Sequence, residues 1–121
     1  MKRVNTTKLR VLIDAAIVKT RNAGIAIERG AFFNYRENKC CPLGALGLAG
    51  LNVDMLRVDS IDSNHARAVI NAHLTSADKE AFWSGFDDLD WCAPSTEASK
   101  RHKNLHRLGH EYGDLHSRGL I

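Results

Sequence analysis

The hydrophobic residues near the start of the chain recur with helical spacing. Thr6 or Thr7 can cap the start of a helix there, because a hydroxyl accepts a hydrogen bond from a first-turn N–H. Gly24 can end it in a left-handed conformation. The pattern predicts a helix over about residues 7–23. Its buried stripe has positions three or four apart: Leu9, Leu12, Ile13, Ala16 and Ile17.

The pattern changes in the next segment, where short runs replace the helical spacing. Residues 31–35 are rich in aromatics, residues 36–39 are polar and suit a turn, and Asn38 tolerates a left-handed backbone. Cys40 and Cys41 then return as a second extended run. We expect a small β-hairpin that lies against the helices, because two strands alone are marginal in water.

A short helix is predicted from Pro42 to Ala49. Proline suits the first helical position, since its missing N–H has no partner there. Gly50 suits the left-handed position after the helix end. Gly44 and Gly47 lie on one face and cost about 1 kcal/mol each relative to alanine. We therefore expect another backbone to approach that face closely.

Two helices follow after a polar connection. Ser63 can cap the first, and Thr75 with Asp78 three residues later resembles a capping box for a second helix through Phe86. That second helix and the residues just after it carry four aromatics, which suggests an aromatic anchor of the core: Phe82, Trp83, Phe86 and Trp91. The apolar stripe of the first helix is Ala66, Val69, Ile70, His73 and Leu74.

A last, long helix is predicted from about Thr96 to Arg118, with Gly119 at its end. Its apolar stripe is narrow, so much of its circumference should face solvent. That stripe is Leu105, Leu108, Tyr112 and Leu115.

Together these elements predict a mostly helical α+β protein with four or five helices and one small β-hairpin. The 121 residues and 13.4 kDa suit a single compact domain over residues 1–121. We expect seven residues to share the core with the stripe of the first helix: Phe32, Tyr35, Leu43, Leu46, Phe82, Trp83 and Phe86.

Composition narrows the class of protein. Hydrophobic residues make up 44% and charged residues 26%, which is ordinary for a globular domain. No apolar run has the roughly 20 residues of a membrane span, and no signal-peptide core is present, so we predict a cytoplasmic protein with no membrane partner. Three cysteines, two of them adjacent, favour reduced thiols over a disulfide framework.

Charge is segregated along the chain although the net charge is only +3. Residues 1–21 carry six basic residues against one acidic residue, and residues 76–97 carry six acidic against one basic. Residues 100–107 then hold four basic residues and no acid. Such blocks either pair within the fold or face a partner.

Three histidines recur every four residues on the last predicted helix: His102, His106 and His110. Histidines at i and i+4 can bind one zinc ion, and Asp114 or Cys92 could add a ligand, so one interpretation is a small metal-dependent hydrolase. However, no glutamate stands between the histidines as a general base, and their basic neighbours repel a cation. We favour a solvated histidine face with no metal or other cofactor.

Two further candidates for chemistry also have plainer interpretations. Cys41 precedes Pro42 at a helix N-terminus, where the helix dipole lowers a thiol pKa. No motif ties a histidine to Cys41, so a buried structural residue is favoured. Asp87, Asp88 and Asp90 offer oxygen ligands for Mg²⁺ or Ca²⁺, but the calcium-loop spacing is absent and an acidic loop that neutralises basic residues is favoured. No catalytic residues are predicted.

The block from Cys40 to Leu46 resembles small uncharacterised bacterial and phage proteins that share a Cys-x-Leu-Gly-Ala core. Those proteins often carry an aromatic-Gly-Phe-Asp segment downstream, here Trp83 to Asp87, and a Leu-Gly pair in their last helix, here Leu108-Gly109. The resemblance implies a phage or mobile-element origin and no activity, substrate or catalytic residue.

These observations favour a non-catalytic interaction protein, an inhibitor or adaptor that binds a host protein. Cations near a helix N-terminus oppose the helix dipole, so attraction to an acidic surface accounts for their placement better than stability does. Neutralisation of these cations within the fold by Asp87, Asp88 and Asp90 is the plainer interpretation and is slightly favoured over a binding face. The predicted partner-binding residues are Lys100, Arg101, Lys103, His106, Arg107 and His110.

Two other functions stay open from sequence. The basic blocks also suit a nucleic-acid-binding accessory protein, whose phosphate contacts would make binding steeply salt-dependent. The metal-dependent hydrolase is the alternative from the enzyme class. The sequence also leaves a homodimer open.

Overall fold

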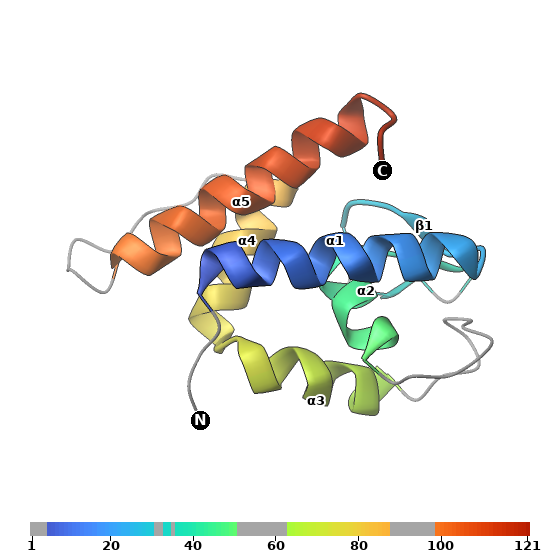
Figure 1. The fold of residues 1–121 in the computed structure, drawn as a ribbon, viewed down its shortest axis with the longest axis horizontal. Helices are drawn as coiled ribbons and strands as arrows, with labels where there is room; N and C mark the ends of the chain where they lie inside the picture. Colours follow the sequence, from blue (N-terminus) through green and yellow to red (C-terminus); the bar gives the residue numbers. More distant parts are fainter. Residues whose placement is uncertain (1–4, 31–32, 35, 51–62, 88–98) are drawn as a thin grey trace.

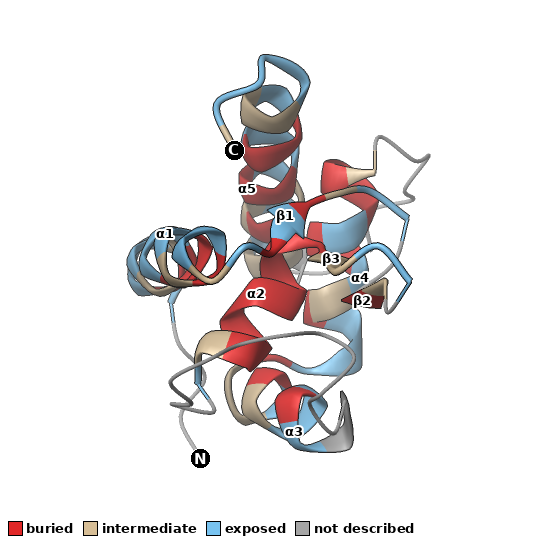
Figure 2. Cartoon of the chain, turned by 90° about the vertical axis from the view of Figure 1, so that its right-hand side faces the viewer, coloured by how far each residue is buried: buried red, intermediate tan, exposed pale blue. Residues whose placement is uncertain are grey.

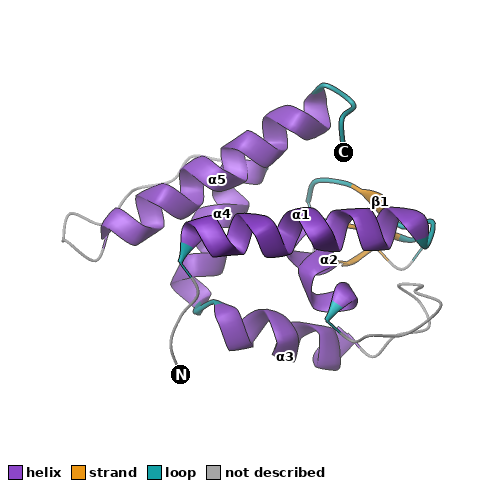
Figure 3. Cartoon of the chain, in the orientation of Figure 1, coloured by secondary structure: helices purple, strands orange, loops and turns teal. Residues whose placement is uncertain are grey.

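The computed structural model describes residues 5–30, 33–34, 36–50, 63–87 and 99–121. Over these residues the chain forms five helices and three short strands (Figure 1), and Figure 3 shows that helices dominate the fold. The mostly helical α+β class is therefore confirmed. The elements in chain order are α1 (Thr6–Asn22), β1 (Ala26–Ile27), β2 (Phe33–Asn34), β3 (Lys39–Cys40), α2 (Pro42–Ala49), α3 (Ser63–His73), α4 (Ser76–Phe86) and α5 (Ser99–Ser117).

The helix ends test the predicted caps. Asn5, not Thr6 or Thr7, caps α1, because its side-chain oxygen accepts a hydrogen bond from the Lys8 N–H at 2.8 Å. Gly24 and Gly119 have the left-handed φ values of +85° and +73° expected after a helix end. The Gly50 prediction is wrong, since its φ of −71° is right-handed.

The hairpin prediction is confirmed, and a third strand joins it. β2 pairs with β3 in antiparallel register, Phe33 opposite Cys40, through a turn in which Asn38 has a φ of 56°. β1 pairs with β3 in parallel, so the strand order is β1–β3–β2. The sequence pattern missed β1, because its two residues are ordered by a partner more than ten positions away.

Helix α2 lies at the centre of the molecule, between α1 and α3, and Figure 2 shows it as an almost entirely buried element. Every residue from Pro42 to Leu48 is buried. Gly47 permits the close approach that the sequence predicted, because a Cβ there would lie 2.6 Å from the Ala66 carbonyl oxygen of α3.

The predicted core is confirmed at Leu43, Leu46, Phe82 and Phe86, which are buried with the α1 stripe. The prediction that Trp83 belongs to the core is wrong, because this residue of α4 is 36% exposed. Phe32, Tyr35 and Trp91 lie outside the described residues. Among the described helices, none is long and apolar enough to cross a membrane.

Candidate interaction surface on helix α5

Helix α5 packs closely against α4. Gly85 and Gly109 make this possible, because a Cβ at Gly85 would overlap the His106 carbonyl oxygen and one at Gly109 would overlap the Phe82 carbonyl oxygen. Leu105, Leu108 and Tyr112 are buried as predicted. The inner side of α5 is therefore fixed by backbone-to-backbone packing.

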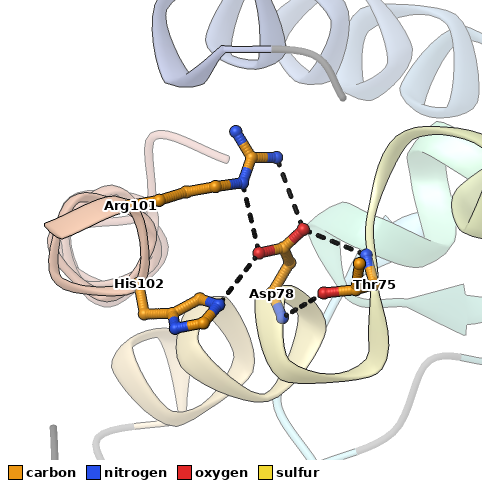
Figure 4. Close-up of polar contacts among 4 residues, drawn as sticks. All are labelled: Thr75, Asp78, Arg101 and His102. Atoms are coloured by element: carbon orange, nitrogen blue, oxygen red, sulfur yellow. Dashed lines mark hydrogen bonds and ion pairs between the residues drawn. The ribbon is translucent and has the colours of Figure 1, made fainter. Parts of the chain in front are cut away.

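A buried carboxylate lies at the N-terminal end of this helix pair (Figure 4). Asp78 has no solvent exposure and forms the predicted capping box with Thr75: its Oδ2 accepts from the Thr75 N–H at 3.0 Å, and its own N–H donates to Thr75 Oγ1 at 3.2 Å. Arg101 donates from Nε to Oδ1 at 3.2 Å, and His102 Nε2 lies 3.2 Å from the same oxygen. Arg101 and His102 of α5 are thereby tied to α4.

Two opposing effects act on the pKa of Asp78. Burial raises the pKa of this carboxyl, since it penalises the charged form. The hydrogen bonds from the Thr75 backbone and from Arg101, together with the positive charge of Arg101, outweigh burial and leave the pKa below its usual value. Asp78 is therefore held as an anion that Arg101 neutralises.

The three histidines of the predicted ladder face different surroundings. His102 faces Asp78, His106 Nδ1 lies 3.3 Å from the Ala81 carbonyl oxygen, and His110 is exposed. Among the described residues, no group of three or more His, Cys, Asp or Glu side chains is arranged to hold a metal. Asp114 instead pairs with Arg118 at 3.5 Å, and Cys92 lies outside the described residues.

The outward side of α5 carries the other residues of the predicted site. Lys100, Lys103, Arg107 and His110 are all exposed. In the part of the chain that the structure describes, none of the four is recorded in a hydrogen bond or an ion pair. The six predicted partner-binding residues therefore divide into two internal ones, Arg101 and His106, and four that remain available to a partner.

Asp87 belongs to the acidic cluster that could neutralise the cations of α5, but it contacts another part of the molecule. Asp87 Oδ1 accepts a hydrogen bond from the Gly30 N–H at 3.2 Å, near Arg29, which donates from Nε to the Phe86 carbonyl oxygen at 2.8 Å. Asp88 and Asp90 lie outside the described residues. The basic start of α5 contacts Asp78 instead, which sequence reasoning assigned only to a cap. Its contact with Arg101 and His102 was not visible in the pattern.

A cleft of about 410 Å³ opens between the start of α1 and the middle of α5. Arg10 spans its wall, since it forms an ion pair with Glu111 and lies 5.7 Å above the Tyr112 ring. Tyr112 in turn donates to Asp14 Oδ1 at 2.6 Å. Sequence reasoning missed this cleft, because it depends on how α1 crosses α5. Its lining is Thr6, Thr7, Arg10, Asn104, Arg107, Leu108 and Glu111.

Cys41 has the structural role that the sequence favoured. It caps α2, with its Sγ 3.3 Å from the Gly44 N–H, and it is buried. Burial raises the pKa of the Cys41 thiol to about 12, and the hydrogen bond from Gly44 only partly offsets this. The less favoured alternative, a thiolate with a pKa lowered by the helix dipole, is therefore not present. Cys40 and Cys41 are both free thiols, as predicted.

Comparison with known proteins leaves the site to be interpreted from its own geometry. No family model matches the chain, and no curated protein and no solved structure matches it either. The resemblance to small bacterial and phage proteins stays a prediction. The structure does give its motif residues a physical reason, because Gly85 and Gly109 are where α4 and α5 touch.

Proposed function

We propose that this protein is a non-catalytic interaction protein, of the inhibitor or adaptor type, whose α5 face binds an acidic protein partner. The observation that carries the proposal is the division of charge on α5. Arg101 is neutralised within the fold, whereas Lys100, Lys103 and Arg107 are exposed without a recorded partner among the described residues. Lys100 lies in the first turn of α5, where a cation opposes the helix dipole and gains no stability, and a positive patch steers and orients an acidic partner.

A charge reversal on the outward side of α5 tests the proposal. The variant is Lys100→Glu with Lys103→Glu and Arg107→Glu, used as bait beside the wild type for capture from a host lysate, followed by mass spectrometry. The control reverses Arg36 and Lys8, which are exposed cations outside α5. We expect one dominant protein that the wild type and the control capture and the α5 variant loses, at an unchanged melting temperature.

Two results of this experiment would contradict the proposal. Equal capture by all three baits contradicts the proposal, and so does a large fall in melting temperature for the α5 variant, because the cations would then be structural. Nuclease treatment of the lysate adds a second test. Capture that disappears after this treatment favours the nucleic-acid-binding accessory protein instead.

A further inference from the structure

We infer that the cleft between α1 and α5 holds a carboxylate side chain of an acidic protein segment, with Arg107 as its charged partner; this inference rests on the proposed function. The cleft is continuous with the outward cations, because Arg107 belongs to both. It therefore gives a partner one concave binding position beside the exposed cations of α5.

The charges in the cleft are not equivalent. Arg10 is committed to Glu111, whereas Arg107 is exposed and has no recorded ion pair among the described residues. An incoming carboxylate meets one free guanidinium, whose planar fork suits two parallel hydrogen bonds to a carboxylate. The Arg10–Glu111 pair closes one wall and adds no net charge to the cleft.

The uncharged lining suits a side chain with a polar end and an apolar stem. Because Asn5 caps α1, the hydroxyls of Thr6 and Thr7 are not used as caps, and both residues line the cleft. Asn104 adds an amide, and Leu108, which is 6% exposed, supplies the apolar contact. Hydroxyl and amide groups donate to a carboxylate oxygen, while the methylenes of a glutamate can pack on Leu108.

The length of the cationic stripe favours a protein segment over a nucleic acid. From Lys100 to Arg107 it spans eight residues, or about 10 Å at 1.5 Å per residue. Glu111 and Asp114 follow directly on α5, and both are exposed. A phosphate backbone that continued along the helix would meet both acids, whereas a short acidic segment in the cleft meets only Glu111, which Arg10 neutralises.

A residue-resolved titration tests the inference on the full chain. The ¹⁵N-labelled protein is titrated with a hexaglutamate peptide and, in parallel, with a twelve-nucleotide oligothymidine, and amide shifts are followed by NMR. We expect hexaglutamate to shift the amides of Thr6, Thr7 and Asn104, and Arg107→Gln to weaken its binding at least fivefold. The matched control is Arg36→Gln, an exposed cation of the β2–β3 turn, which should bind like the wild type.

The outcomes separate the cleft from the function. Shifts confined to Lys100 and Lys103, with Arg107→Gln equal to the wild type, overturn the cleft while the proposed acidic-partner surface stands. Tighter binding of oligothymidine than of hexaglutamate, or no shift on α5 with either probe, overturns both.

Discussion

The side of α5 that faces α4 and the side that faces solvent both carry basic residues, but these residues differ in how they are held. On the inner side, Arg101 and His102 contact the buried carboxylate of Asp78, and Gly109 lies against the α4 backbone. On the outer side, Lys103 and Arg107 project from the same helix with no recorded ion pair among the described residues. The difference teaches that a basic run along a helix is not one surface, since neighbouring cations serve stability and recognition separately.

The largest expected effect is at the α4–α5 contact. Gly109→Ala should destabilise the protein by about 3 kcal/mol, because the added methyl would overlap the Phe82 carbonyl oxygen and neither backbone can move aside. Helix propensity alone predicts the opposite sign, a gain of about 1 kcal/mol. Urea unfolding of the variant shows whether the clash or the helix propensity dominates the change in stability. The control on the exposed side of α5 is His110→Ala. A stabilised Gly109→Ala variant would show that the inner side is not closely packed.

The next effect concerns the buried carboxylate and its dependence on pH. Asp78→Asn should cost about 2 kcal/mol at neutral pH, because Arg101 loses its counter-charge in a buried site. The pKa of Asp78 lies below its unfolded value of about 3.9. Its contribution is therefore present above about pH 4 and is lost as the pH falls through the folded pKa.

This pH dependence has its own check. The difference in unfolding free energy between the wild type and Asp78→Asn should shrink as the pH is lowered below 4. A difference that stays constant over that range would mean that the ion pair with Arg101 does not form in solution.

A smaller effect is expected where α1 crosses α5. Tyr112→Phe keeps the ring that packs on Phe82, at a centroid distance of 5.9 Å, and removes only the hydroxyl that donates to Asp14 at 2.6 Å. We expect a loss of about 1 kcal/mol, the typical contribution of one hydrogen bond. Thermal unfolding of the variant measures it, and an unchanged melting temperature would argue against this contact as a link between the two helices.

What the sequence predicted well depends on neighbouring residues. The Thr75–Asp78 capping box and the left-handed Gly24 are each decided within one helical turn. What it missed depends on distant parts of the chain. Strand β1 needs β3 as a partner. The exposure of Trp83 depends on which side of α4 meets α5, which adjacent aromatics cannot indicate.

The candidate site shows the same limit. Lys100, Lys103 and Arg107 were placed on a solvent-facing side by the narrow apolar stripe alone. Arg101 was grouped with them because its partner, Asp78, lies 23 residues earlier in the chain. The cleft was beyond prediction, since it forms only where Thr6 and Thr7 of one helix meet Asn104 of another.

The division of α5 into a structural and a recognition side is tested most directly by removing one arginine from each. Arg101→Ala and Arg107→Ala delete the same side chain from the same helix, and their free energies of unfolding can be compared in urea at neutral pH. The account predicts a loss of about 3 kcal/mol for Arg101→Ala, which leaves a buried carboxylate without its counter-charge, and a change within about 0.5 kcal/mol for Arg107→Ala. Equal losses for the two variants would contradict it.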